Sequence, residues 1–197
     1  MEQLKVKLLN ASPLEVADLA ISKCWDKPSK DQDHMIERMY RVGIKNKHAS
    51  TLEHLVYTFD IDGISRACLQ ELARHRMASL SVKSTRYTLK ELQNAETVSD
   101  FLVSSGDYEV DEANIVALQT IQYIMSKRSI ANDKIKYCLP EAYKTSLVWT
   151  INARSLRNFL ELRTSRAALE EIQTLALRIY MEVPDEHKFL FSDCIQE

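Results

Sequence analysis

The sequence predicts one domain of the α+β (mixed α/β) class, with a central, twisted and largely antiparallel sheet flanked by helices. Three observations predict this class. A few short stretches alternate apolar and polar residues, as half-buried strands do, and more numerous stretches repeat apolar residues at helical spacing. The chain has 197 residues, 45% of them hydrophobic, which is enough to bury one full core. No internal repeat or low-complexity tract is visible, so we expect a single domain over residues 1–197.

The first sixty residues show strand, helix, helix and strand patterns in turn. Apolar residues alternate with lysines over residues 4–8, which predicts a strand. The run Ser12-Pro13-Leu14-Glu15 has the pattern of a capping box and predicts a helix that continues to about Lys23. After a polar loop, a second helix is predicted at about 34–42. Alternation over residues 55–61 predicts the next strand.

Gly63 is expected to end that strand, and a helix follows that runs from residue 64 into Arg74. Residues 93–112 are polar and are expected to form the least ordered excursion of the domain.

Five further elements are predicted in the C-terminal half. A helix spans about 111–127, and a short helix ends before Leu139-Pro140. The apolar run 147–151 predicts a strand. Apolar residues then share one face of a helix over 156–163, with an arginine in its last turn. A last long helix carries apolar residues at helical spacing over 168–183.

The scarcity of glycine excludes several kinds of nucleotide site. Only Gly43, Gly63 and Gly106 occur, so the chain has no glycine-rich phosphate loop and no dinucleotide fingerprint after a strand. If the protein binds a nucleotide, side chains must hold the phosphates.

The overall composition favours a cytoplasmic protein without a membrane partner. No apolar run approaches the ~20 residues that span a bilayer, and the first residues lack the apolar core of a signal peptide. The cysteines are scattered singly and are expected to be free thiols: Cys24, Cys68, Cys138 and Cys194. A formal net charge of −2 and a pI near 6.2 argue against a duplex-binding domain, so no nucleic-acid partner is expected.

The segment from Leu72 to Lys90, called the basic segment below, has an unusual charge. It holds five Lys or Arg residues and one His but no Asp or Glu. Taken singly, Arg74 and Arg76 fit a solvated cluster at a helix C-terminus. An unbroken absence of acids with several Ser and Thr residues interleaved favours an anion site instead, because guanidinium groups match phosphate geometry.

Other candidate residues give weaker evidence of a binding, metal or catalytic site. A second arginine set lies at 154–166, and Arg154 within it stands at a strand–helix junction, where binding residues collect. His48, Glu53 and His54 fit no standard zinc spacing. Ser84 has no sequence neighbour that would activate it as a nucleophile.

Three blocks of the chain resemble one enzyme family. Arg74-His75-Arg76, then seven residues, then Ser84 resembles the Arg-His-Arg-x7-Ser signature of flavin-dependent thymidylate synthases, and Arg86-Tyr87 fits the extension of that motif. His48 to His54 is similar to the upstream flavin-contacting segment of the family. A C-terminal block is matched by Leu139-Pro140, Asn152-Ala153-Arg154-Ser155-Leu156, Asn158-Phe159-Leu160 and Leu162-Arg163.

The resemblance implies a reaction and a set of site residues. Reduced FAD would supply hydride, 5,10-methylenetetrahydrofolate the one-carbon unit and NADPH the electrons for the flavin, so that dUMP becomes dTMP. The residues expected to contact FAD are His48, Ser50, Arg74, His75, Arg76, Asn152, Arg154 and Asn158. Those expected to hold dUMP are Glu71, Arg74, Ser84, Thr85, Arg86 and Lys136. Arg163 would sit against the pyrimidine as the catalytic residue and favour its ionised N3 form. The family also implies a homotetramer whose active sites are shared between subunits.

The chain departs from the family pattern at five places. Ser81-Val82 stands where Asn-Glu is usual, Lys136 where Arg is common, and Glu71 where Gln is frequent. Ala167 and Leu169 replace a His and a Gln. A second hypothesis therefore stays open at this point, namely a non-catalytic nucleotide or nucleic-acid binding protein that uses the basic segment.

Overall fold

A four-stranded antiparallel sheet forms the centre of the protein. The computed structural model describes residues 4–196. The strands are β1 (Lys5–Ala11), β2 (Val56–Ser65), β3 (Ala78–Val82) and β4 (Lys144–Asn152), and they lie in the order β1-β2-β4-β3. All neighbouring pairs are antiparallel, which confirms the predicted fold class.

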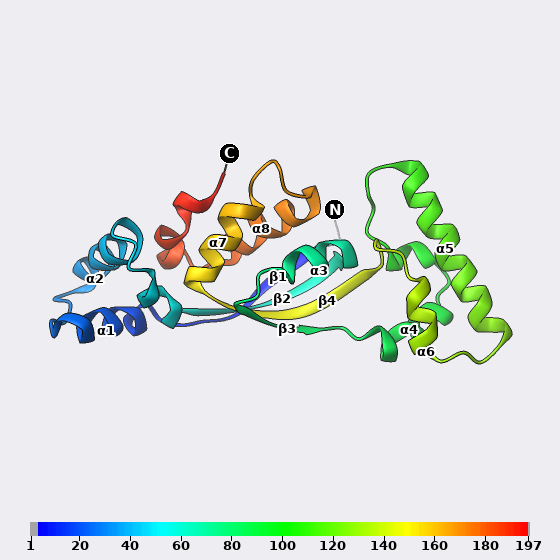
Figure 1. Cartoon of the computed structure of the whole chain (residues 1–197), viewed down its shortest axis with the longest axis horizontal. Coiled ribbons are helices and arrows are strands. Elements are labelled where there is room, and N and C mark those ends of the chain that lie inside the picture. The colour runs from blue at the N-terminus through cyan, green and yellow to red at the C-terminus, as the bar shows by residue number, and fades with distance from the viewer. Residues whose placement is uncertain (1–3, 197) are drawn as a thin grey trace.

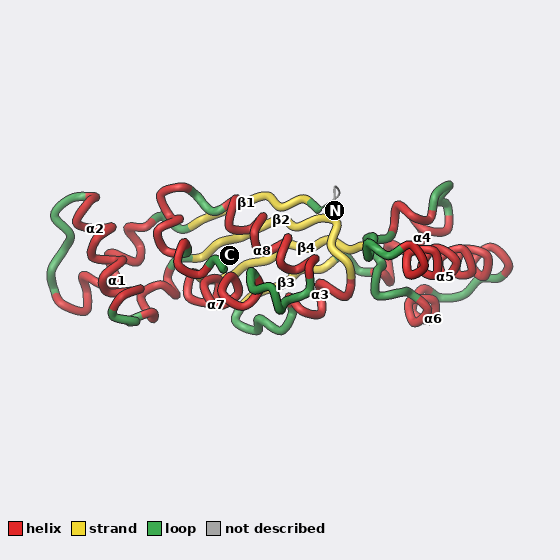
Figure 2. Tube along the Cα trace, turned by 90° about the horizontal axis from the view of Figure 1, so that it is seen from above, coloured by secondary structure: helices red, strands yellow, loops and turns green. Residues whose placement is uncertain are grey.

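Within the described residues, eight α-helices surround this sheet unevenly. They are α1 (Leu14–Trp25), α2 (Gln32–Met39), α3 (Arg66–Leu72), α4 (Thr85–Gln93), α5 (Tyr108–Lys127), α6 (Asn132–Ile135), α7 (Ala153–Arg163) and α8 (Glu170–Glu182). Helices α3, α7 and α8 lie over one face of the sheet, whereas α1 and α2 lie at one end and α4, α5 and α6 at the other (Figure 1; Figure 2). A π-helical turn (Tyr40–Lys45) follows α2 directly. Short 3-10 turns occupy Ala49–His54, Val98–Phe101, Lys136–Cys138, Asp185–Leu190 and Ser192–Cys194.

The main core lies between the sheet and the helices that cover it. Alternate residues of β2 and β4 point into this layer, as the sequence alternation predicts. Trp149 packs at its centre between Phe59 and Phe159, with ring centroids 6.3 and 5.0 Å away. The opposite face is polar, and there Thr58 and Thr150 share a hydrogen bond of 3.1 Å across the strands. A smaller buried cluster holds α4, α5 and α6 together, with Leu89, Leu92, Leu118 and Ile121 among its members.

The capping box predicted at Ser12 is wrong. Pro13 is the N-cap of α1, and no side chain caps this helix. The Ser12 hydroxyl instead accepts a hydrogen bond from the backbone N–H of Val56 at 3.0 Å. Pairing of β1 with β2 brings Val56 next to Ser12. The Ser12 hydroxyl therefore bonds to a strand residue and does not form the helix cap that the local sequence predicted.

The expected break at Gly63 is also wrong. Strand β2 continues to Ser65, and its register against β4 shifts between Asp62 and Ile64. Gly63 adopts φ of +83°, which suits a bulge that bends a strand without ending it. The following helix α3 ends at Leu72 and does not run into Arg74.

Strand β3 and helix α4 were not predicted. Ala78, Leu80 and Val82 alternate with two serines, so β3 does carry the period of a strand and could have been found from it. The strand lies at the sheet edge, where Ser79, Ser81 and Val82 are exposed. The stretch at 93–112 holds a 3-10 turn, a bridge from Leu102 to Tyr143 and the start of α5. Within residues 4–196, no helix is long and apolar enough to cross a membrane.

Candidate functional site

A cavity of about 550 Å³ opens where the start of α7 meets the turn between α3 and β3. Seven of the residues that the sequence singles out line it: Arg74, His75, Arg76, Asn152, Arg154, Asn158 and Arg163. Two segments about 80 positions apart in the chain are therefore brought together at one place. Four further lining residues were not predicted as site residues: Glu53, Met77, Ser155 and Leu162.

The junction of β4 and α7 positions one wall of this cavity. Asn152 is the N-cap of α7, and its side-chain oxygen accepts a hydrogen bond of 2.9 Å from the Ser155 N–H. The helix then presents Arg154 and Asn158 on one face, because residues four apart lie above one another. Leu162, four positions further on, could have been found by the same spacing. Glu53 forms an ion pair of 2.7 Å with Arg154, and this contact holds the guanidinium at the cavity.

Arg163 is the most constrained cation of the cavity. Its side chain is 14% exposed. Its Nη1 donates to Glu71 Oε2 at 2.6 Å, its Nη2 to the Glu71 carbonyl at 3.2 Å and its Nε to His75 Nε2 at 3.0 Å. Three contacts fix both the position and the plane of the guanidinium, so Arg163 is a preorganised positive charge.

His75 lies beneath Arg163 and is 8% exposed. Its ring packs edge-on against Phe159 at a centroid distance of 5.0 Å. Burial, followed by the neighbouring charges of Arg163 and Arg74, lowers the pKa of His75 to about 4. The imidazole is therefore neutral at pH 7, which lets Nε2 accept the hydrogen bond from Arg163.

The depressed pKa of His75 predicts a pH dependence of stability. The unfolded imidazole binds a proton near pH 6.5 and the folded one only near pH 4, so stability falls as the pH drops between these values. The slope from this group is at most ~1.4 kcal/mol per pH unit. In His75→Gln the free energy of unfolding, measured by urea denaturation between pH 7 and 5, should fall less steeply than in the wild type. His54→Gln, at an exposed position, is the matched control, and equal slopes in wild type and His75→Gln would contradict the assignment.

The predicted phosphate-binding residues form a separate cluster at the far end of β3. Ser84 is the N-cap of α4 and makes no side-chain capping bond. Arg86 pairs with Asp133 at 2.6 Å, and the Asn132 side chain donates to the Arg86 carbonyl at 2.7 Å. These contacts hold α4 against α6. Lys136 begins the 3-10 turn after α6, and so belongs to the same end of the molecule.

Strand β3 separates this cluster from the cavity. Ala78 pairs with Ile151 near one end of β4, whereas Val82 pairs with Leu147 towards the other. The four steps from Ala78 to Val82 span roughly 13 Å at the usual rise of a strand. Thr85 lines a smaller cavity of about 140 Å³, to which no residue of the first cavity contributes. Within one chain, the predicted flavin-binding and phosphate-binding residues therefore lie at different places.

Two predicted flavin contacts, His48 and Ser50, do not line the cavity, although Glu53 of the same segment does. No group of three or more His, Cys, Asp or Glu side chains that could hold a metal ion occurs between residues 4 and 196.

The basic segment contains no acidic residue, but acids from elsewhere in the chain form ion pairs with some of its cations. Lys83 pairs with Glu91 at 2.6 Å, and Arg86 with Asp133. Arg76 has no acidic partner among residues 4–196, and Arg74 has only a 3.9 Å contact to Glu71. Arg74 and Arg76 at the cavity therefore keep positive charge for an external anion, as Lys90 does on α4.

Comparisons with known proteins agree on one family. A family model described as "Thymidylate synthase complementing protein" matches residues 7–187. A flavin-dependent thymidylate synthase from Campylobacter jejuni is 52% identical over 98% of this chain and 99% of its own length. One from Wolinella succinogenes is 51% identical over 94% of this chain and 96% of its own length. The crystal structure of thymidylate synthase X from Helicobacter pylori with FAD and dUMP superposes with a TM-score of 0.91 at 43% identity, covering 98% of this chain and all of that one.

Proposed function

Because this chain belongs to the flavin-dependent thymidylate synthase family, we propose that it is a thymidylate synthase that converts dUMP to dTMP with FAD as its cofactor. We further propose 5,10-methylenetetrahydrofolate as the one-carbon donor and NADPH as the reductant. One observation supports this proposal most directly. Seven residues that the family motifs single out, from two distant segments, converge on a single cavity.

The cavity fits the chemistry of FAD. Arg74, Arg76 and Arg154 offer guanidinium groups to a pyrophosphate, which suits a chain without a glycine-rich phosphate loop. The amides of Asn152 and Asn158 offer donors and acceptors to the polar edges of a ring. When bound, FAD supplies the hydride for the methylation step. His48 and Ser50 are proposed as contacts to the flavin from the segment that also carries Glu53.

We assign the recognition of dUMP to two groups of residues. Ser84, Thr85, Arg86 and Lys136 would bind the phosphate end, where helix α4 begins with its hydroxyl groups and a guanidinium. Arg163 would contact the pyrimidine and stabilise the N3-deprotonated form, because a fixed cation in a water-poor site favours the anion. Arg74, at the rim of the same cavity, would contact the nucleotide as well.

The separation along β3 supports a shared active site. A ligand that contacts both Arg163 and Arg86 within one chain would have to span the length of β3, since these side chains lie at different ends of the strand. A second copy of the chain would bring its phosphate-binding cluster to the cavity of the first. The family's homotetramer would complete each site in this way.

The family resemblance places Glu71 among the residues that hold dUMP, but its contacts lead us to propose the opposite effect, namely that Glu71 weakens the binding of dUMP. Its carboxylate neutralises Arg163 and lies 3.9 Å from Arg74, so it opposes an anionic substrate at both cations. Glu71→Gln keeps an oxygen that accepts from Arg163 but removes the charge. The KM for dUMP should fall about three- to tenfold, equivalent to ~1 kcal/mol of electrostatic free energy. Steady-state kinetics measure this change, and Glu161→Gln on the exposed side of α7 is the control. A higher KM in Glu71→Gln would contradict the role given to the charge.

The proposed activity has a direct test. Purified protein should show flavin absorbance, should oxidise NADPH faster when dUMP is present, and should form dTMP when methylenetetrahydrofolate is added. A protein that stays colourless after incubation with FAD would refute the proposal. The alternative of a non-catalytic nucleotide or nucleic-acid binder is not favoured, because the relatives are enzymes over nearly the whole chain. It predicts salt-sensitive binding of RNA or DNA without NADPH oxidation.

We propose a cytoplasmic location. All four cysteines are free, and Cys68 and Cys194 are buried as thiols, as is common for proteins of a reducing compartment.

A further inference from the structure

A second cavity, of about 670 Å³, lies where the end of α1 faces α2. It shares no lining residue with the cavity that we assign to the flavin. Its walls are Trp25, Pro28 and five basic side chains, and no Asp or Glu is among them. A cavity whose ionisable lining is entirely basic attracts anions.

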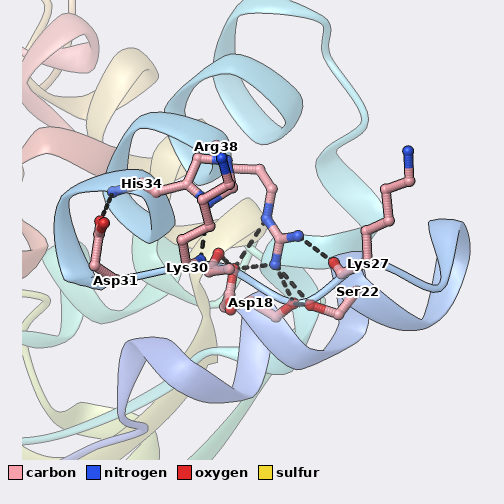
Figure 3. A network of polar contacts seen from close by, with 8 residues as sticks. Asp18, Ser22, Lys27, Lys30, Asp31, His34 and Arg38 are labelled. Carbon is pink, nitrogen blue, oxygen red and sulfur yellow. Dashed lines mark hydrogen bonds and ion pairs between the residues drawn. The ribbon is translucent and has the colours of Figure 1, made fainter.

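A buried arginine builds the floor of this cavity. Arg38 is 4% exposed and is surrounded by acceptors. Its Nε donates to Asp18 Oδ1 at 3.1 Å, and its Nη groups donate to the Ser22 hydroxyl at 2.6 Å and to the Lys27 carbonyl at 2.5 Å (Figure 3). The contact to Lys27 ties the turn after α1 to α2. The cavity is therefore formed by a fixed network and needs no ligand to order it.

The remaining cations of this cavity have no acid of their own. Asp18 neutralises Arg38, but Lys27, Lys30 and Arg41 make no ion pair with any residue between 4 and 196. Cations without an acidic partner also occur elsewhere among the described residues, Arg76 for example, so the distinguishing feature here is that three of them line one cavity.

The acidic residues of this region do not line the cavity. Residues 23–41 contain five Lys or Arg and four Asp or Glu, so the segment is nearly neutral in sequence. Asp31 caps α2 by accepting from the His34 N–H at 2.8 Å, and none of the four acids lines the cavity. The fold thus separates the acids from the bases and leaves an uncompensated positive charge at the cavity.

Trp25 adds a flat apolar surface beside these charges. It is 52% exposed, although tryptophan is usually well buried. The turn that carries it continues through Asp26, whose φ of +52° is in the left-handed region that non-glycine residues seldom adopt. The Arg38 contact to the next residue, Lys27, stabilises this turn. An exposed aromatic ring next to unpaired cations matches a ligand that joins a planar ring to a phosphate.

We propose that this cavity is a second nucleotide site, in which Lys27, Lys30 and Arg41 hold the phosphates and the base stacks on Trp25. The site is independent of the thymidylate synthase activity, since none of its residues belongs to the groups assigned to FAD or dUMP. Its ligand class is a nucleoside diphosphate or a nucleotide of similar charge.

The test uses the FAD-loaded enzyme with saturating dUMP, so that both assigned sites are filled. ADP is titrated while tryptophan fluorescence is followed. The chain has two tryptophans, and Trp149 is fully buried, so a solvent-exposed emission reports Trp25. We expect ADP to quench this emission and the quenching to disappear in Trp25→Phe. Calorimetry should give a weaker affinity for pyrophosphate than for ADP, and increasing salt should weaken both.

Charge variants separate this site from general charge effects. Lys30→Glu with Arg41→Glu should raise the Kd for ADP at least about tenfold, because two favourable charges become repulsive. Lys23→Glu with Lys45→Glu makes the same change in net charge at exposed positions outside the cavity and should leave the Kd unchanged.

The proposal is overturned if ADP leaves the Trp25 emission unchanged at millimolar concentration, or if the two double variants behave alike. Equal affinity for ADP and pyrophosphate would overturn the assignment to a nucleotide. Unchanged dTMP formation in the Lys30/Arg41 variant shows that it is folded and that the first proposal stands apart from this one.

Discussion

Arg163→Ala is expected to lower kcat for dTMP formation by roughly 10²–10³-fold, the usual effect of removing one preorganised charge that stabilises an anion. The flavin should stay bound, because Arg74, Arg76 and Arg154 remain in the cavity. The measurement is dTMP formation under saturating substrates, together with the flavin absorbance of the purified variant.

Two further variants sharpen this result. Arg163→Lys keeps the charge but loses the bidentate contact with Glu71 and the bond to His75, so a partial loss of turnover is expected. Arg166→Ala, at an exposed position just beyond α7, is the control and should behave as the wild type. Unchanged turnover in Arg163→Ala would reject the role given to Arg163.

Arg86→Ala is expected to raise the KM for dUMP by roughly 10²-fold, which corresponds to ~3 kcal/mol for one charged partner of a phosphate. The kcat should change less, because Arg86 is assigned to the phosphate of dUMP and not to the pyrimidine ring. Lys90→Ala, further along α4 and without an ion pair among the described residues, is the control. A KM that stays within twofold of the wild type would show that Arg86 does not hold the phosphate.

Mixing these two variants tests whether sites are shared. Each variant alone lacks one half of every site. If Arg163 and Arg86 of one site come from different subunits, co-expression of the two variants produces some sites with both arginines intact, about a quarter of the total for random assembly. Activity well above that of either variant is the expected result. No gain in a co-expressed, purified mixture would mean that both residues serve the site from the same chain.

Short-range patterns predicted much of this fold correctly. The alternation in β2 and β4 and the apolar face of α7 depend only on the period of a strand or a helix, and each appears close to its predicted place. The failures occur where a distant partner decides the local structure. The Ser12 hydroxyl suits a helix cap as well as a strand contact, and Val56, 44 positions away, determines the outcome.

The candidate site likewise combines residues that sequence patterns predicted with contacts that those patterns did not predict. The Arg-His-Arg motif and the Asn152 to Arg154 segment were recognised as residue patterns, and the structure places both at one cavity. The pairing of Arg163 with Glu71 joins residues 92 positions apart, and that of Arg154 with Glu53 joins residues 101 apart. No spacing rule predicts such pairs. In the basic segment, likewise, Glu91 and Asp133 from outside it neutralise Lys83 and Arg86.

Residue types and their spacing were therefore enough to predict the fold class, the family and the identity of most cavity residues. They were enough because periodicity and motif chemistry are local properties of the chain. Only the tertiary structure decided which acid neutralises which base. It also decided that the residues predicted to contact flavin and those predicted to bind phosphate lie at opposite ends of β3, and that Lys27, Lys30 and Arg41 line a cavity without acids. The physical reason is that Coulomb energy and burial depend on distances in space, and these are established when the sheet assembles segments that are far apart in sequence.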